Sequence, residues 1–149
     1  SFRSHIAVSR ETGLPLIIHS RSADDDMLRI LKEEYRRGEF NGVLHCFSSG
    51  LELAEFAIDI GLYISISGIA TFAKSTELRN IIKTIPKSQL LIETDSPYLA
   101  PHPYRGKRNE PSFVAEIAKY LADFLEVELE IFREQTTLNF HYLFKKVSR

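Results

Sequence analysis

Two histidines and one aspartate, each placed where a short apolar stretch of the sequence ends, could together bind a divalent metal ion. His19, His45 and Asp95 close the stretches 16–18, 43–44 and 90–92. Imidazole nitrogens and carboxylate oxygens are common ligands of such ions. Each residue also has a simpler interpretation. A lone histidine at the end of a strand is often only solvated, and an aspartate before Ser-Pro readily caps a turn.

Basic side chains at two places in the sequence could hold a phosphate. The first is Arg21, because a guanidinium suits bidentate contact with phosphate oxygens. The second lies in the Pro-rich loop 96–111 and consists of Arg105, Lys107 and Arg108. Three cations within four positions could grip a phosphate. The alternative is a solvated basic loop, which the pattern alone slightly favours.

The sequence does not indicate a serine or cysteine nucleophile. Ser48 and Ser49 lack the Gly-x-Ser-x-Gly turn of hydrolases that use serine. Cys46 directly follows His45, and side chains alternate along a strand, so we expect Cys46 to point away from the face that His45 uses. We therefore interpret Cys46 as a packing residue.

Strands and helices are predicted to alternate along the chain. Short, almost wholly apolar stretches are typical of parallel strands buried on both faces, and they occur at 16–18, 43–44, 62–67 and 90–92. Amphipathic patterns predict helices at 2–11, 22–37, 51–60, 76–84, 112–125, 128–135 and 137–146. This order indicates an α/β fold with right-handed crossovers. Four strands would make either a small open sheet or half of an eight-stranded barrel, which usually needs about 250 residues.

The architecture decides where the candidate ligands meet. In parallel α/β folds, active sites gather at the carboxyl ends of the strands. Because His19, His45 and Asp95 each follow a predicted strand, we expect them to lie together at that edge of the sheet.

Composition limits the classes of function. The chain has 149 residues, 44% hydrophobic and 26% charged, as in globular domains. Its net charge of -1 means that nucleic acid could bind only at a local basic patch. A single cysteine excludes an intramolecular disulfide and favours a cytoplasmic location. No apolar run approaches the roughly 20 residues that span a bilayer, and residues 1–10 lack the apolar centre of a signal peptide, so we expect no membrane partner.

Several motifs occur here in the order in which one known family carries them. They read GLPLIIHSR at 13–21, GVLHCFS at 42–48, YISISG at 63–68, LIETDSPYLAP at 91–101, YRGKRNEP at 104–111 and TTLNFHYLF at 136–144. Each motif is moderately specific, whereas the series in order is highly specific. Together they resemble the TatD family of metal-dependent deoxyribonucleases over essentially the whole chain.

The resemblance implies a fold, an activity and a set of ligands. The fold would be a TIM-type (β/α)8 barrel of the metal-dependent hydrolases, with residues 1–149 as a single domain forming its C-terminal half, strands five to eight. Family members hydrolyse phosphodiester bonds in DNA, often from the 3′ end, with two divalent ions such as Mg, Mn or Zn. His19 and His45 match ligands of one ion. Asp95 matches the carboxylate that holds the other ion or a water and can act as the catalytic base. The implied partner is DNA, as single strands or 3′ ends.

The chain departs from the family pattern in one important respect. The family begins with a His-x-His pair on its first strand and has a bridging glutamate after its fourth, and no His-x-His occurs here. We therefore expect only part of the metal shell, and association with a missing N-terminal half or dimerisation to cover the open edges of a half-barrel. The alternatives are a catalytically inactive half-barrel remnant and a related amidohydrolase acting on a small substrate. The basic loop argues mildly against the amidohydrolase.

Overall fold

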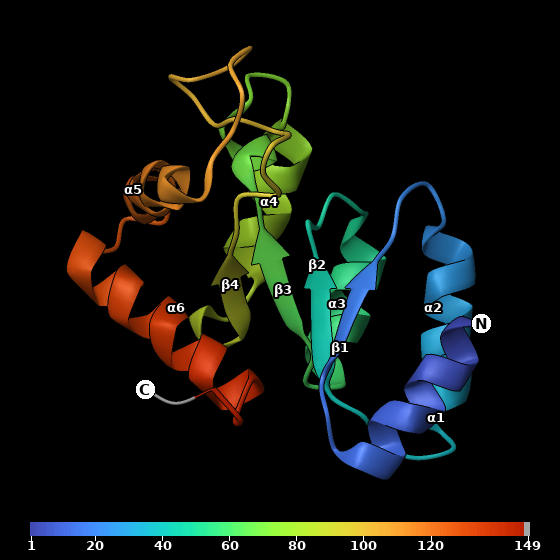
Figure 1. Ribbon diagram of the computed structural model, residues 1–149. Helices are drawn as coiled ribbons and strands as arrows, with labels where there is room; N and C mark the ends of the chain where they lie inside the picture. Colours follow the sequence, from blue (N-terminus) through green and yellow to red (C-terminus); the bar gives the residue numbers. More distant parts are fainter. Residues whose placement is uncertain (148–149) are drawn as a thin grey trace.

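The computed structural model describes residues 1–147 of the chain. The sequence predicts four parallel strands, and they form one sheet in the order β1-β2-β3-β4 (Figure 1). The strands are β1 Leu16–His19, β2 Gly42–His45, β3 Tyr63–Ile66 and β4 Leu90–Ile92. The α-helices are α1 Phe2–Thr12, α2 Asp24–Tyr35, α3 Leu51–Asp59, α4 Thr76–Thr84, α5 Val114–Phe124 and α6 Leu129–Leu143. The 3-10 turns are η1 Gly68–Thr71, η2 Lys87–Gln89 and η3 Pro111–Phe113. None of the helices within residues 1–147 is long and apolar enough to cross a membrane.

The last helix differs from the prediction. The sequence predicts two helices, 128–135 and 137–146, but α6 runs unbroken from Leu129 to Leu143. Threonine disfavours a helix interior because its hydroxyl competes for backbone groups. Here the Thr136 hydroxyl donates back to the carbonyl of Phe132, 3.1 Å away, which keeps it within the helix. Phe132 and Thr136 are both buried on the same side of α6, and this packing stabilises the helix across Thr136.

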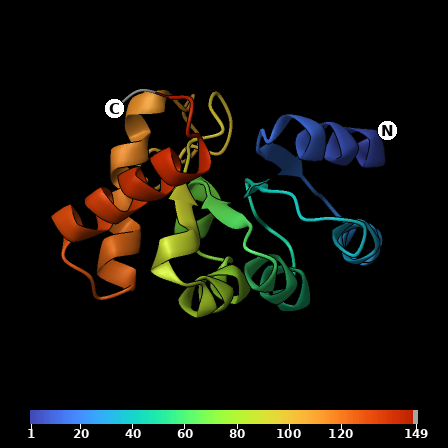
Figure 2. The same ribbon diagram turned by 90° about the horizontal axis from the view of Figure 1, so that it is seen from below.

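One face of the sheet carries the main hydrophobic core. Figure 2 shows α2, α3 and α4 arranged in an arc outside the strands. Strand residues directed to this outer face are nearly inaccessible to solvent, among them Ile18, Leu44 and Ile64. They belong to one continuous cluster that also receives buried side chains from α1 to α5. Burial of apolar surface on this scale is the dominant favourable contribution to folding.

The opposite, inner face of the sheet is covered only in part. Val43 and Leu91 pack there with Leu143 of α6 in a separate small cluster. Away from α6, Ile17 on β1 is 66% exposed although it lies in a strand. A cavity of about 420 Å³ between the strands and α6 is lined by Ile17, Ser65 and Phe140 among others. The inner face is therefore an apolar surface that most of the helices do not reach.

A buried carboxylate joins the first two helices. Glu34 on α2 is 2% exposed and contacts Arg3 at 2.7 Å, Arg10 at 2.9 Å and Arg37 at 2.8 Å. Arg3 and Arg10 lie on α1, so the carboxylate holds α1 against α2. Hydrogen bonds from Arg3 and then Arg10 lower the pKa of Glu34 below its usual value, because they stabilise the ionised form.

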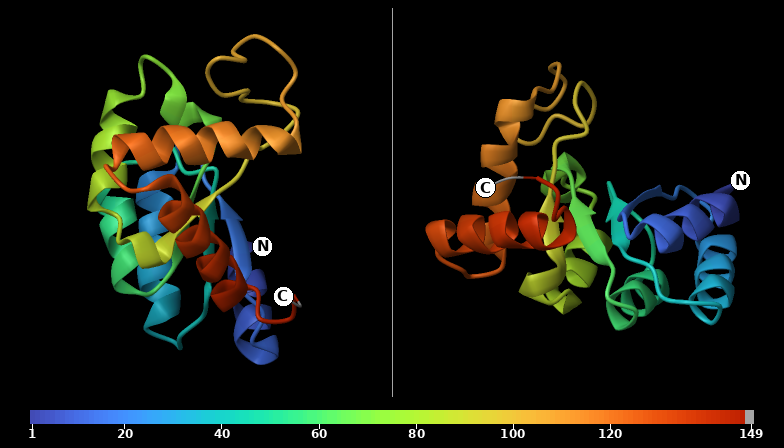
Figure 3. Two further views of the ribbon diagram at one scale, coloured as in Figure 1. Left: turned by 90° about the vertical axis from the view of Figure 1, so that its left-hand side faces the viewer. Right: turned by 60° about the horizontal axis from the view of Figure 1, so that its bottom comes forward.

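Two loops meet beyond the carboxyl ends of the strands. The segments 68–75 and 96–111 lie at the same end of the molecule in Figures 1 and 3. The backbone N–H of His102 donates to the hydroxyl of Thr71 at 2.9 Å. A Cβ at Gly68 would lie 2.1 Å from the carbonyl oxygen of Leu99, closer than any side-chain atom could approach. Glycine at 68 is therefore required for the two loops to touch through their backbones.

Candidate metal centre

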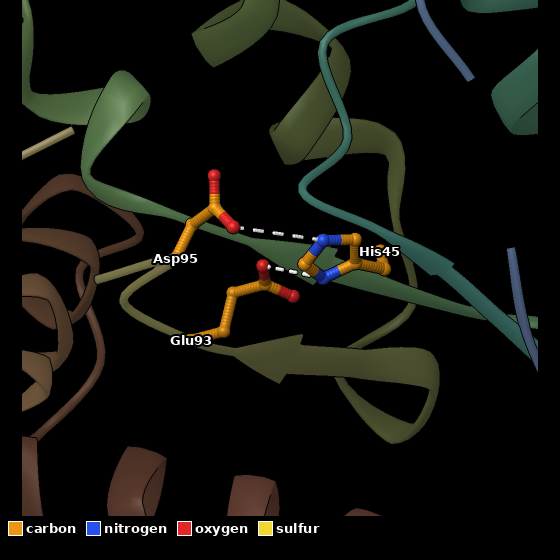
Figure 4. A group of neighbouring side chains, drawn as sticks. All are labelled: His45, Glu93 and Asp95. Atoms are coloured by element: carbon orange, nitrogen blue, oxygen red, sulfur yellow. Dashed lines mark ion pairs between the residues drawn. The ribbon is translucent and has the colours of Figure 1, made fainter. Parts of the chain in front are cut away.

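His45 lies between two carboxylates at the carboxyl edge of the sheet. Its Nδ1 is 2.7 Å from Oε1 of Glu93, and its Nε2 is 3.7 Å from Oδ1 of Asp95. Figure 4 shows both acidic side chains directed toward the imidazole from the segment that follows β4. All three side chains are partly buried, and one ligand atom from each lies within 4.8 Å of the others.

Strand pairing and one unusual backbone angle bring these groups together. In the sheet register His45 on β2 is opposite His19 on β1, and the N–H of Glu93 donates to the carbonyl of Ile66 at 3.0 Å. The extended backbone therefore continues past β4 and delivers Glu93 to the inner face. Asp95 has a φ of 55°, a conformation that aspartate tolerates better than most residues. Its φ places the chain in a tight turn at the edge of the sheet, where the carboxylate meets His45.

The donor set fits a divalent cation. Oε1 of Glu93 is buried and close to His45, yet it has no aligned hydrogen-bond partner among residues 1–147. A buried carboxylate oxygen without a partner is costly, so its usual complement is a cation or a hydrogen-bond donor. Nitrogen and carboxylate oxygen ligands suit Zn, Mn and related ions. The three side chains could thus hold a metal ion, and they include His45 and Asp95, two of the residues for which the sequence analysis expected metal ligation.

His19 lies beside this group. Its ring centroid is 5.6 Å from that of His45, in the adjoining strand. His19, Arg21 and Asp95 line a common cavity of about 570 Å³ together with Tyr98. The prediction that the polar residues after the strands converge at one edge is therefore met in the structure, and Arg21 stands at the same cavity.

The predicted orientation of Cys46 is wrong. Its Sγ lies 3.3 Å from the hydroxyl of Ser67 and 3.7 Å from Oδ2 of Asp95, so Cys46 and His45 reach the same carboxylate. Side-chain alternation fails because Cys46 follows β2 with a φ of 47°, which turns its side chain back toward the site. The residue is buried, and burial raises the pKa of its thiol to about 11, so a thiolate nucleophile is disfavoured.

The basic loop does not line the cavity that contains His19 and Asp95. The guanidinium carbon of Arg105 lies 3.7 Å from the ring centroid of Phe72, and the ammonium of Lys107 lies 5.7 Å from that of Tyr104. Arg108 is exposed. The three cations are neighbours in the sequence, and in the structure they lie on an exposed loop at the edge of the site.

Glu93 is the site residue that the sequence reasoning missed. The sequence carries Glu93-Thr94-Asp95 after β4, and only Asp95 was assigned a role. Leu91 faces the inner side of the sheet. Counting in steps of two from Leu91, Glu93 falls on the face that His45 occupies. That alternation of side chains could have predicted Glu93 as a site residue from the sequence.

Candidate ligands of a metal ion thus gather at the carboxyl edge of a parallel α/β sheet. The chain belongs to the TatD family, since residues 1–145 match the family described as TatD related DNase.

The curated relatives are described as metal-dependent hydrolases or as an exonuclease. The chain is 46% identical over 144 residues to the uncharacterized metal-dependent hydrolase YcfH of Escherichia coli K12, a match that covers 97% of this chain and 54% of the relative. It is 42% identical over 144 residues to the uncharacterized metal-dependent hydrolase YabD of Bacillus subtilis, covering 97% and 56%. The 3′-5′ ssDNA/RNA exonuclease TatD of Klebsiella pneumoniae is 32% identical over 149 residues, covering 97% and 56%. The chain thus spans about half the length of the curated relatives it matches.

Solved structures agree on the fold. A TatD family hydrolase from Entamoeba histolytica superposes with a TM-score of 0.82 at 25% identity, covering 98% of this chain and 56% of that one. The TatD homologue YJJV of Escherichia coli gives a TM-score of 0.84 at 26% identity, covering 95% and 54%. These likenesses and the parallel sheet fit a TIM-barrel hydrolase.

Proposed function

We propose that this chain forms part of the active site of a nuclease that hydrolyses phosphodiester bonds in DNA with the help of divalent metal ions. The observation that carries the proposal is the convergence of His45, Glu93 and Asp95 at the carboxyl edge of the sheet. Membership of the family described as TatD related DNase supports it. The relative from Klebsiella pneumoniae named as a 3′-5′ ssDNA/RNA exonuclease supports nucleic acid as the substrate class.

The proposed ligands of the metal ions are His19, His45 and Asp95, and Glu93 is the carboxylate partner of His45. By the family resemblance, His19 and His45 share one ion, and Asp95 holds a second ion or a water. Divalent ions in such a site lower the pKa of bound water and stabilise negative charge on the phosphate oxygens. Mg, Mn and Zn each suit part of this donor set.

The protein side chains would divide the remaining work between them. Asp95 is the proposed catalytic base, because its carboxylate lies at the cavity and can accept a proton from the attacking water. Glu93 faces Nδ1 of His45 and would fix the orientation of the imidazole. Arg21, which lines the same cavity, is the proposed contact to the phosphate that is cleaved.

The cations Arg105, Lys107 and Arg108 are proposed to contact phosphates beyond the scissile one. They belong to the loop that extends past the carboxyl ends of the strands (Figure 1). Their exposure leaves their charges available to a polyanion, and such contacts weaken as salt is added.

We propose further that residues 1–149 are the C-terminal half of a barrel, corresponding to its strands five to eight. The supporting observations are the open inner face at Ile17 and a match to only about half the length of the relatives. A complementary half, or a second copy of the chain, would cover that face and complete the metal shell. A cytoplasmic location is proposed on the unpaired Cys46.

The test is degradation of a labelled single-stranded DNA by the purified chain with Mg²⁺ or Mn²⁺, and with EDTA. His45→Ala removes the central imidazole and should abolish the metal-dependent activity while the unfolding midpoint stays within the range of ordinary surface variants. His5→Ala is the matched control, because His5 is exposed on α1 and, among residues 1–147, its side chain hydrogen-bonds only to the carbonyl of Ser1 at 3.0 Å.

Each outcome decides a different part of the proposal. Activity that is lost in His45→Ala and kept in His5→Ala supports a site assembled from these strands. Equal turnover in both variants removes His45 from the site. If the wild-type chain is inactive, the same assay on the chain mixed with the N-terminal half of the YcfH relative decides between an enzyme portion and an inactive remnant.

A further inference from the structure

Tyr98 is an aromatic side chain held in solvent at the rim of the metal-site cavity. It is 72% exposed, more than any other large apolar side chain that is exposed within residues 1–147. It lines the cavity of about 570 Å³ that His19, Arg21 and Asp95 also line. An exposed aromatic ring beside a charged site is typical of a surface that contacts a ligand.

The backbone that carries Tyr98 is firmly fixed. Its N–H donates to the carbonyl of Asp95 at 3.0 Å. The amide of Asn109, only 3% exposed, donates to the carbonyls of Tyr98 at 2.5 Å and Thr94 at 2.8 Å. The N–H of Asn109 in turn donates to the carbonyl of Pro97 at 3.0 Å. The ring is thus presented from a rigid support, which lowers the entropy lost when a partner binds.

The other large rings of the two neighbouring loops already have partners. Phe72 is covered by the guanidinium of Arg105 at 3.7 Å. Tyr104 stacks on Phe113 with centroids 4.2 Å apart and planes 7° from parallel. Of the Phe and Tyr rings in the described segments 68–75 and 96–111, Tyr98 alone has no stacking partner. A planar group that enters the cavity would therefore find this ring face open.

We propose that Tyr98 is a specificity-determining residue on which a base of the nucleic acid substrate stacks. The inference rests on the proposed function, since it places the phosphate at Arg21 and the adjoining nucleoside at the rim of the same cavity. Stacking on an aromatic ring accepts every base, because each base has a π-face. Tyr98 would thus favour single-stranded ends, whose bases are free to leave the helix, over paired ends.

The test measures binding and not turnover. The whole chain is titrated into a fluorescein-labelled 12-nucleotide single strand in EDTA, so that the strand stays intact, and anisotropy gives Kd. A second strand of equal length carries the same backbone with abasic sugars. Tyr98→Ala should weaken binding to the ordinary strand by about tenfold, the order expected for loss of one stacked base. It should leave binding to the abasic strand unchanged, and Tyr98→Phe should bind both strands like the wild type.

Tyr142→Ala is the matched control. Tyr142 is also an exposed tyrosine, but it lines a different cavity with Gly61 and Tyr63, at the opposite end of the strands. This variant should bind both strands like the wild type.

The outcomes separate this inference from the function on which it rests. If the wild-type chain binds neither strand, the metal-free chain holds no nucleic acid and the stacking role of Tyr98 fails, while the degradation assay with Mg²⁺ or Mn²⁺ still decides the proposed function. If the wild type binds and Tyr98→Ala binds both strands equally well, the stacking role fails while the proposed function stands. An equal loss on both strands would assign Tyr98 to the sugar-phosphate backbone and overturn stacking on a base.

Discussion

The two faces of the sheet have different roles, one in packing and the other in the candidate metal site. The outer face belongs to one large apolar cluster, in which strand residues such as Ile64 pack with buried side chains from all six α-helices. The inner face has a three-residue buried cluster under α6, an exposed Ile17, and the group formed by His45, Glu93 and Asp95 at its carboxyl edge. Stability is therefore concentrated on one side of the strands, and candidate chemistry on the other. The same strands serve both because successive side chains point to opposite faces.

Truncating the outer face should produce the largest effect. Ile64 is fully buried in the main cluster. Ile64→Ala should lower the free energy of unfolding by about 2–5 kcal/mol, through lost apolar burial and the cavity left behind. Urea unfolding followed by circular dichroism measures the change. A loss below about 1 kcal/mol would show that the outer face does not dominate stability.

Changing the inner-face carboxylate should affect metal binding and spare the fold. Glu93→Gln keeps the shape of the side chain but removes the charge beside Nδ1 of His45. The affinity for Mn²⁺ should fall by about 10- to 100-fold, as is usual for the partner of a metal-binding imidazole. Isothermal titration calorimetry gives the affinity. Glu52→Gln on the exposed surface of α3 is the control and should bind like the wild type. An unchanged affinity in Glu93→Gln would remove this carboxylate from the site.

Acid should lower the free energy of unfolding by protonating Glu34, which joins α1 and α2. The pKa of Glu34 is lowered by its bonds with Arg3 and Arg10, so its contribution to stability is complete above the ordinary value of 4.5. That contribution is lost as the pH falls from about 4.5 through the folded-state pKa. Urea unfolding between pH 7 and pH 3 should show this loss in the wild type and a shallower one in Glu34→Gln. Glu55→Gln, an exposed control on α3, should follow the wild type; identical profiles for all three proteins would contradict the assignment.

The smallest effect is expected at the open inner face. Ile17 lies in β1 but is 66% exposed, so Ile17→Ala should change the free energy of unfolding by no more than about 0.5 kcal/mol. The comparison with Ile64→Ala, the same substitution on the other face of the sheet, tests the contrast directly. A loss at Ile17 as large as that at Ile64 would mean that the inner face is covered in solution.

The sequence was a good guide where periodicity decides the structure. The short apolar runs predicted all four strands and their parallel direction, because strands buried on both faces need apolar residues throughout. Placement of His19, His45 and Asp95 at one edge followed from the same pattern. The helix α6 was divided in error at Thr136, where a tertiary setting overrode a local preference.

Side-chain direction beyond the strand ends was the part that could not be predicted. Alternation holds only while the backbone is extended, and Cys46 leaves that region with a φ of 47°. The contact of Arg105 with Phe72 could not be predicted either, because it depends on how two loops distant in sequence come together. Such contacts depend on the tertiary structure, and no periodic pattern in the sequence predicts them.

The backbone contact between Gly68 and Leu99 bears on how this scaffold could be re-engineered. An inserted Cβ at position 68 would lie 2.1 Å from the carbonyl oxygen of Leu99, so the loop that carries Tyr98 cannot keep its place over a larger residue. The segments 68–75 and 96–111 therefore make up one transplantable module. A graft that moves the second segment to another protein without the first would lose the surface on which it rests.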